Sequence, residues 1–140
     1  MEIGNLKNYE ILHEKMTKDL RILLEKRDKV FEEIAKFEDL RTIVLHFQNN
    51  SMKELKTLTD IGGNILCEAK VPDLSTLMVD VGFGTCVEMT HTEILSYMPK
   101  KISILTASVA DLESKIVTQQ TNIRIVTAGM AEMKRELKCT

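Results

Sequence analysis

Two long stretches in which apolar residues recur at alternating steps of three and four flank a short, glycine-rich middle. A stripe with this average spacing of 3.5 residues stays on one face of a helix only when the helix supercoils around a partner. Nine of twelve such positions are apolar in the first stretch, and twelve of thirteen are apolar in the last. Two stripes of similar length around a turn-rich middle predict an antiparallel coiled coil, with both chain termini at the same tip.

Four polar residues interrupt these two predicted seams. Long cationic side chains can bury their stems and keep the charge in water, and polar seam positions can fix the register of two helices. The first seam runs through Leu6, Tyr9, His13, Met16, Leu20, Leu23, Arg27, Val30, Ile34, Phe37, Arg41 and Val44. The last seam runs through Leu95, Met98, Ile102, Leu105, Val109, Leu112, Ile116, Gln119, Ile123, Val126, Met130, Met133 and Leu137.

The middle of the chain, residues 55–91, has side chains that alternate in character with a period of two, which is typical of β-strands. Glycine and proline at Gly62-Gly63, Pro72-Asp73 and Gly82-Phe83-Gly84 mark turns that divide this segment into four short strands. The predicted fold class is therefore α+β and mainly helical, with a long antiparallel coiled-coil hairpin joined by two β-hairpins.

We expect one domain over residues 1–140, with helices over about 5–54 and 92–138 on either side of a β-hub over 55–91. Thr90, with Glu93 three residues later, matches a capping box and predicts the start of the second helix. Pro99 removes one backbone hydrogen bond inside this helix, so we expect a kink near Leu95.

The composition argues against several classes of protein. A net charge of -2 and a pI near 5.9 give no electrostatic basis for binding nucleic acid or an anionic membrane. No stretch approaches the roughly 20 apolar residues of a membrane span, and the first residues lack a signal-peptide profile. Three cysteines without a CxxC pair, Cys67, Cys86 and Cys139, suggest free thiols in a reducing compartment, so we expect a soluble intracellular protein.

The histidines, His13, His46 and His91, lie far apart in the sequence. They form no metal-ligand spacing and no nucleophile–base pair. The turn Gly82-Phe83-Gly84 lacks the further glycines and the following helix of a phosphate-binding loop. We therefore predict no catalytic residues, no metal site and no cofactor.

The strands of the middle segment form the first predicted interaction surface. Two hairpins alone are marginally stable in water, so we expect their edges to pair with strands of other chains through backbone hydrogen bonds. The alternative is that the same side chains fill a small self-contained core. The predicted subunit interface consists of Ile61, Ile65, Cys67, Val71, Leu77, Val79, Val81, Phe83, Val87 and Met89.

The open end of the coiled coil forms the second predicted surface. Apolar side chains there lack a full set of neighbours, and methionine adapts readily to different partners. Gly129 destabilises a helix interior by roughly 1 kcal/mol, so this end should be mobile. The alternative is a simple continuation of the seam. The predicted client- or partner-binding tip consists of Ile3, Leu6, Tyr9, Met130, Met133 and Leu137.

The order helix, two β-hairpins, helix within 140 residues resembles the α-class subunits of the prefoldin family. The first helix is also similar to that of a prefoldin-like branch of this class, and the resemblance covers roughly residues 10–115. The stretches that carry it are Asp19-Leu20-Arg21, Arg27-Asp28-Lys29-Val30-Phe31-Glu32, Ala35-Lys36-Phe37, Leu40-Arg41, Asp60-Ile61-Gly62-Gly63-Asn64, Val71-Pro72-Asp73, Val79-Asp80-Val81-Gly82-Phe83-Gly84 and Glu88-Met89-Thr90.

This resemblance implies a non-catalytic subunit of a hetero-oligomeric chaperone or cochaperone complex. In prefoldins the hubs of α-class and β-class subunits join into β-barrels, and the coiled-coil tips hold unfolded proteins. The implied partners are β-class chains, a second α-class chain, unfolded or assembling clients, and a cochaperone assembly that contains RuvB-like ATPases. The prefoldin-like branch also implies a cytoplasmic and nuclear location and a role as a transcription cofactor, without direct contact to nucleic acid or membrane.

Two alternatives stay open. The chain can instead be a subunit of ordinary prefoldin, which delivers unfolded cytoskeletal clients to a chaperonin. It can also be a homodimeric coiled-coil adaptor, which predicts a stable homo-oligomer in isolation.

Overall fold

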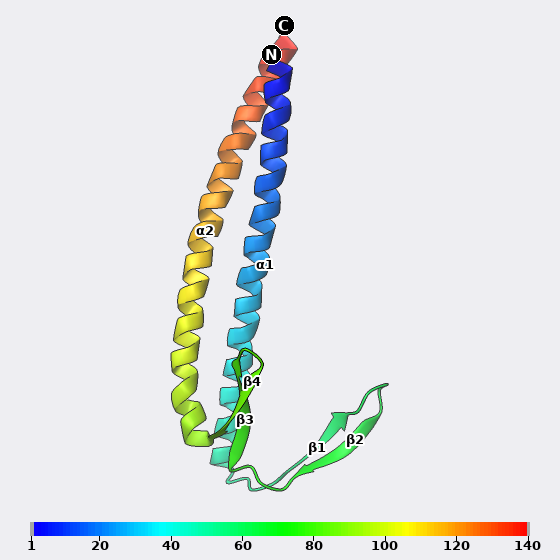
Figure 1. The fold of residues 1–140 in the computed structure, drawn as a ribbon, viewed down its shortest axis with the longest axis vertical. Coiled ribbons are helices and arrows are strands. Elements are labelled where there is room, and N and C mark those ends of the chain that lie inside the picture. The colour runs from blue at the N-terminus through cyan, green and yellow to red at the C-terminus, as the bar shows by residue number, and fades with distance from the viewer. Residues whose placement is uncertain (1, 140) are drawn as a thin grey trace. The chain divides into compact units, whose positions relative to one another are not determined.

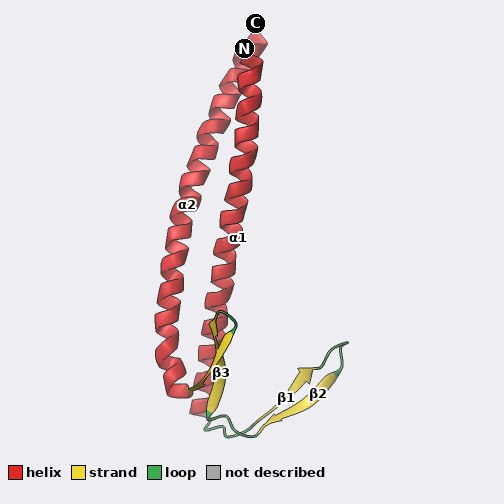
Figure 2. Ribbon diagram, in the orientation of Figure 1, coloured by secondary structure: helices red, strands yellow, loops and turns green. Residues whose placement is uncertain are grey.

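The computed structural model describes the backbone of residues 2–139 and the side chains of residues 6–137. One long helix precedes two antiparallel β-hairpins in the chain and a second long helix follows them, which confirms the predicted fold class (Figures 1 and 2). The elements are α1 (Glu2–Asn49), β1 (Leu55–Asp60), β2 (Leu66–Val71), β3 (Thr76–Gly82), β4 (Thr85–Thr90) and α2 (His91–Cys139).

The chain divides into two compact units, and both helices contribute to each of them. The hub unit is Ile34–Ile104, and the helical unit consists of the residues up to Glu33 together with those from Leu105 onward. The grouping of residues 1–140 as one prefoldin-type domain stays a prediction.

Helix α1 ends at Asn49, five residues before the predicted end at 54. The cause is a Schellman motif, in which the N–H of Met52 donates to the carbonyl of Phe47 at 3.1 Å and the N–H of Ser51 donates to that of Gln48 at 3.1 Å. Ser51 adopts a positive φ of 48°, which turns the chain out of the helix. The sequence prediction missed this end because serine stands where glycine is usual.

In the helical unit, α1 and α2 lie side by side and antiparallel (Figure 1). The Lys134 ammonium and the Glu10 carboxylate form an ion pair at 2.9 Å between the two helices. Every predicted seam position from Leu105 to Leu137 is buried or half-buried, and Val109 and Ile116 are the most deeply covered after residue 105. The apolar stripe therefore closes the two helices on each other, as its spacing predicted.

The hub unit contains the best-packed side chains of the described chain. Val44, Ile94 and Met98 have no exposed surface, and Leu74 and Val79 are almost completely covered. The rings of Phe37 and Tyr97 pack edge to face with 6.5 Å between centroids, and Phe47 lies 6.2 Å from the His91 ring. The ring contacts join the end of α1 to the start of α2, and the buried Val79 lies on β3 of the same unit.

The two hairpins form two separate two-stranded sheets. Strands β1 and β2 pair from Leu55 opposite Val71 to Asp60 opposite Leu66. Strands β3 and β4 pair from Thr76 opposite Thr90 to Gly82 opposite Thr85, with a bulge between Asp80 and Gly82.

Helix α2 begins with the predicted capping box. A Glu93 carboxylate oxygen accepts from the backbone N–H of Thr90 at 2.8 Å, and the Thr90 hydroxyl accepts from the N–H of Glu93 at 3.4 Å. The helix bounds, His91–Cys139, differ by one residue at each end from the prediction. Pro99 lies inside α2 without ending it.

Candidate functional site

Both faces of the β1–β2 hairpin are open. Residues directly opposite each other in an antiparallel pair lie on the same face, so the register separates two sets of side chains. One set is Leu55, Thr57, Thr59, Cys67, Ala69 and Val71, and the other is Lys56, Leu58, Asp60, Leu66, Glu68 and Lys70. Only Leu55 and Ala69 are half-buried among these twelve residues.

Large apolar side chains at the far end of this hairpin are in water. Ile61 is 67% exposed and Ile65 is 60% exposed, and the N–H of Ile61 donates to the carbonyl of Ile65 at 3.0 Å across the turn. Full burial of one such side chain stabilises a protein by about 1.5–3 kcal/mol. Burial of these side chains against a partner would therefore release a large favourable free energy that the isolated chain does not gain.

The β3–β4 hairpin differs, because its apolar face is covered within the hub unit. Val79 is 3% exposed, and Leu77, Val81 and Met89 are half-buried. Val87, on the same face, remains partly exposed. The structure thus divides the predicted interface: the β3–β4 residues belong largely to a core of their own chain, whereas Ile61, Ile65, Cys67 and Val71 remain exposed.

Phe83, the remaining residue of the predicted interface, is fully exposed at the β3–β4 turn. Leu58 and Leu66 were missed by the sequence analysis, although they are as exposed as Ile61 and Ile65. Strict alternation assigns them to the charged face of the hairpin, where Lys56 and Glu68 are their neighbours. The sequence did contain a signal for them, because each face of each strand includes at least one apolar residue.

Short hydrogen bonds fix the turns of the hub. The carboxylates of Asp60, Asp73 and Asp80 accept from the backbone N–H two residues later, at 2.8, 2.9 and 2.8 Å respectively. The bond from the Ser75 N–H holds the pKa of Asp73 below its ordinary value. The Lys70 ammonium pairs with the Glu54 carboxylate at 2.8 Å. The strands are thus held in a defined register.

The predicted tip residues continue the apolar seam of the helical unit. Leu6, Met130, Met133 and Leu137 are half-buried, and Tyr9 is 40% exposed. The side chain of Ile3 lies outside the described residues. These side chains are part of the seam of the helical unit, and their role in binding clients stays a prediction.

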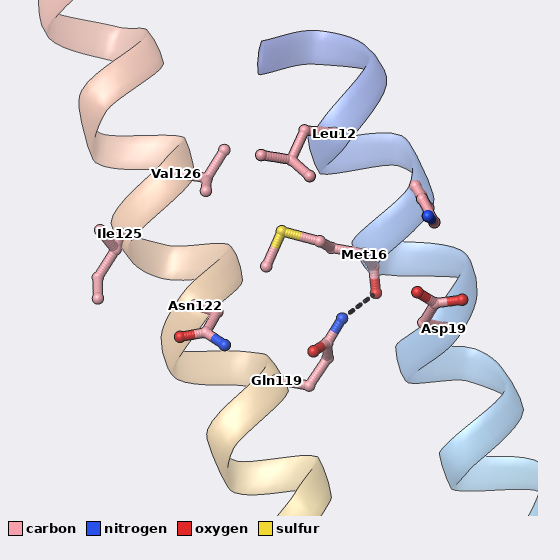
Figure 3. A pocket seen from close by; sticks show the side chains of 8 residues that line it. Leu12, Met16, Asp19, Gln119, Asn122, Ile125 and Val126 are labelled. Atoms are coloured by element: carbon pink, nitrogen blue, oxygen red, sulfur yellow. Dashed lines mark hydrogen bonds between the residues drawn. The ribbon is translucent and has the colours of Figure 1, made fainter. Parts of the chain in front are cut away.

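A groove of about 470 Å³ lies between α1 and α2 further along the helical unit (Figure 3). Its polar lining includes Gln119, whose side-chain amide donates to the carbonyl of Met16 at 3.1 Å. None of the predicted tip residues lines it. The lining residues are Leu12, Lys15, Met16, Asp19, Gln119, Asn122, Ile125 and Val126.

The described part of the chain contains no group of three or more His, Cys, Asp or Glu side chains arranged to hold a metal ion. Cys67 and Cys86 are free and exposed. Over the same described residues, neither helix has a segment apolar enough to span a membrane. The main surface features of the described residues are an open hairpin, an exposed aromatic turn and a groove lined by both apolar and polar side chains.

Comparison with known proteins gives concordant matches. The profile of the family described as "Prefoldin subunit" matches residues 16–136. The chain is 32% identical over 119 residues to Protein UXT of Homo sapiens, covering 85% of this chain and 76% of that protein. It is 29% identical over 133 residues to a Protein UXT homolog of Dictyostelium discoideum, covering 94% and 83%.

Among solved structures, filamentous PFD from Methanocaldococcus jannaschii superposes with a TM-score of 0.55 at 21% identity. The match covers 87% of this chain and 98% of that chain. This similarity concerns the fold, and it agrees with the resemblance drawn from the hub and first-helix residues.

Proposed function

The chain belongs to the prefoldin family, and from this premise we propose that it is a non-catalytic α-class subunit of a prefoldin-like hetero-oligomeric cochaperone complex of the UXT type. The observation that carries the proposal is the β1–β2 hairpin, which is open on both faces. The named relatives support the UXT type over ordinary prefoldin.

Strand pairing with other subunits accounts for the open hairpin. Among the described residues, each of its two strands has one hydrogen-bonded neighbour, so the outer backbone groups of both strands are not paired with another strand. Added strands would satisfy these groups and would cover the apolar side chains at the same time. The proposed partners are β-class prefoldin-like chains and a second α-class chain.

The groove of the helical unit suits the contact with clients. Leu12, Met16, Ile125 and Val126 offer apolar surface, and the flexible thioether of Met16 can adapt to side chains of different shape. We place the client contact at this groove rather than at the half-buried tip. Unfolded or assembling proteins with exposed apolar segments are the proposed clients.

The proposed cellular location and the further partners are those that the resemblance to UXT-type proteins implies. We place the complex in the cytoplasm and nucleus, in contact with a cochaperone assembly that contains RuvB-like ATPases, and we place any role as a transcription cofactor in the assembled complex. Fluorescence microscopy of the tagged chain tests the location: exclusion from both compartments contradicts it.

Affinity purification of the tagged chain from its own cells, followed by native mass spectrometry, tests the complex. Recovery of β-class prefoldin-like chains with a RuvB-like ATPase supports the proposal. Recovery of ordinary prefoldin subunits with a chaperonin replaces the UXT type by ordinary prefoldin. Elution of the chain alone as a stable homodimer replaces the hetero-oligomer by the coiled-coil adaptor.

Matched aspartate variants test the role of the open hairpin. The double variant Ile61→Asp and Ile65→Asp should keep the helical circular dichroism of the isolated chain, because both side chains are already in water. Its assembly with β-class chains should be lost, because charged side chains would enter an apolar interface. The control Ile104→Asp changes an isoleucine of α2 that is 67% exposed, the same fraction as Ile61. This variant should assemble normally.

A second pair of variants tests the groove. Leu12→Asp combined with Ile125→Asp should reduce the ability of the assembled complex to suppress aggregation of a chemically denatured model protein. The control combines Ile22→Asp with Val117→Asp, which are exposed positions of the same two helices outside the groove. Equal loss of activity in both double variants contradicts the groove as the contact site.

A further inference from the structure

The turn between β3 and β4 has an unusual residue at its centre. The pairing of Gly82 with Thr85 leaves Phe83 and Gly84 as the two turn residues, with positive φ values of 56° and 69°. A type I′ turn requires positive φ at both of its central residues, and it favours asparagine, aspartate or glycine there. A bulky aromatic residue in this conformation is an outlier.

The turn of the β1–β2 hairpin has the usual residue types at its two central positions. These are Gly63 and Asn64, at φ values of 64° and 62°, residues that reach the left-handed region readily. Phenylalanine there costs about 1–2 kcal/mol relative to the right-handed conformation. The β3–β4 turn therefore has a less stable backbone than the chain could have with asparagine in place of Phe83.

Nothing in the described part of the chain offsets this cost. The Phe83 side chain is 109% exposed, which means that it projects completely into water. An exposed phenylalanine also forgoes the free energy of burial, which is about 1.5–3 kcal/mol. Backbone strain and exposure at the same residue indicate a role outside the isolated chain.

Hydrogen bonds hold the backbone of the hairpin that carries this side chain. The Asp80 carboxylate accepts from the Gly82 N–H at 2.8 Å, and the Thr76 hydroxyl donates to Glu88 at 2.6 Å between the two strands. The same hairpin is anchored through the buried Val79. A side chain presented on such a pre-organised element loses little conformational entropy on binding.

We propose that Phe83 is an aromatic anchor that inserts into an apolar pocket of a neighbouring subunit with a different sequence. The inference rests on the proposed function, since the neighbour is a member of the same complex. Strands β3 and β4 each have one hydrogen-bonded neighbour, so a subunit that pairs with either edge lies beside the turn. Buried aromatic anchors dominate the energy of many interfaces.

The charges of the hairpin specify the rim of this pocket. Residues 76–90 contain Asp80 and Glu88 and no lysine or arginine. A rim with lysine, arginine or free N–H groups complements them. The same acidic charges repel nucleic-acid phosphates and anionic lipid headgroups, so the anchor is directed at protein.

The substitution Phe83→Asn tests the anchor without endangering the fold. Asparagine is the better turn residue, so the thermal midpoint of the isolated chain should stay equal or rise. Assembly with co-purified β-class chains, measured by mass photometry over a dilution series, should weaken at least tenfold. The control Met78→Asn, at a 66% exposed position of the same hairpin, should leave assembly unchanged.

A photo-crosslinker identifies the occupant directly. With p-benzoylphenylalanine at position 83 of the assembled complex, crosslinks should map to one apolar site on one neighbouring subunit. Crosslinks to a second copy of this chain, or equal assembly of wild type and Phe83→Asn, overturn the anchor while the proposed function stands. Failure of the wild-type chain to assemble with any β-class chain overturns both.

Discussion

Gln119 on α2 and Met16 on α1, 103 residues apart in the sequence, are joined by a hydrogen bond of 3.1 Å from side-chain amide to backbone carbonyl oxygen. Gln119 is the one polar position of the predicted second seam, and its side chain is half-buried. Polar seam residues fix the register of two helices at a cost in stability. This bond therefore sets which residues of α1 face which residues of α2 in the helical unit.

Replacement of Gln119 by leucine should raise the free energy of unfolding by about 1 kcal/mol, because an apolar side chain then fills the seam. Urea denaturation followed by circular dichroism at 222 nm measures this change. Gln120→Leu, at the exposed neighbouring position, should change stability by less than about 0.5 kcal/mol. A lower stability of Gln119→Leu would show that the hydrogen bond outweighs the apolar contact.

Ser51→Gly should stabilise the end of α1. Ser51 has a φ of 48° at the position of the Schellman motif where glycine is preferred. Glycine removes the steric cost of the left-handed conformation, and we expect a gain of about 0.5–1 kcal/mol after the greater entropy of the unfolded chain is included. Ser51→Val should have the opposite effect. The two thermal midpoints, measured side by side, must lie on opposite sides of the wild-type value.

Glu93 should make the stability of the chain depend on pH in acid. Hydrogen bonds from the backbone N–H of Thr90, and then from its hydroxyl, hold the pKa of Glu93 below the ordinary value of 4.5. A carboxyl whose pKa is lower in the folded state stabilises that state above the unfolded pKa. The stabilisation is lost as the pH falls through the folded pKa.

Glu93→Gln should therefore have a lower thermal midpoint than the wild type at pH 7. The difference between the two midpoints, called the gap below, should become smaller as the pH falls below 4.5. Thermal unfolding at a series of pH values, at constant ionic strength, measures this gap. A gap that stays constant down to pH 2 would assign the effect of Glu93 to helix propensity instead of charge.

The periodicity of the sequence was sufficient to predict the helices and the seam, because burial of an apolar stripe follows directly from its spacing. The capping box at Thr90 was also predictable, since its partners are three residues apart. The end of α1 was not, because it depends on backbone bonds around Ser51. Alternation predicted the strands, but it could not say which hairpin has a covered face.

The difference between the two hairpins depends on contacts that are distant in the sequence. Val79 is buried in the hub unit, whereas Ile61 has the same apolar character and stays in water. Nothing in the local pattern separates these two residues. The groove beside Gln119 was missed for a similar reason: the seam spacing predicts contact between helices, whereas a hollow depends on the shapes of the facing side chains.

The hub core should respond strongly to loss of volume. Ile94 has no exposed surface, so Ile94→Ala should lower the free energy of unfolding by about 2–5 kcal/mol. Ile104→Ala makes the same chemical change at an exposed position of α2 and should cost less than about 1 kcal/mol. Chemical denaturation of both variants under identical conditions gives the comparison, and similar losses would contradict the packing of the hub unit.

The open β1–β2 hairpin makes the fate of each copy depend on the supply of its partners. Exposed strand edges with apolar side chains pair with other strands without much selection, and such segments are prone to aggregate. By mass action, the stability of the hairpin rises with the concentration of the subunits that cover it. On the proposed assembly, we expect a cell that makes this chain in excess of its partners to accumulate aggregation-prone copies instead of additional complexes, so that the scarcest subunit sets the amount of complex.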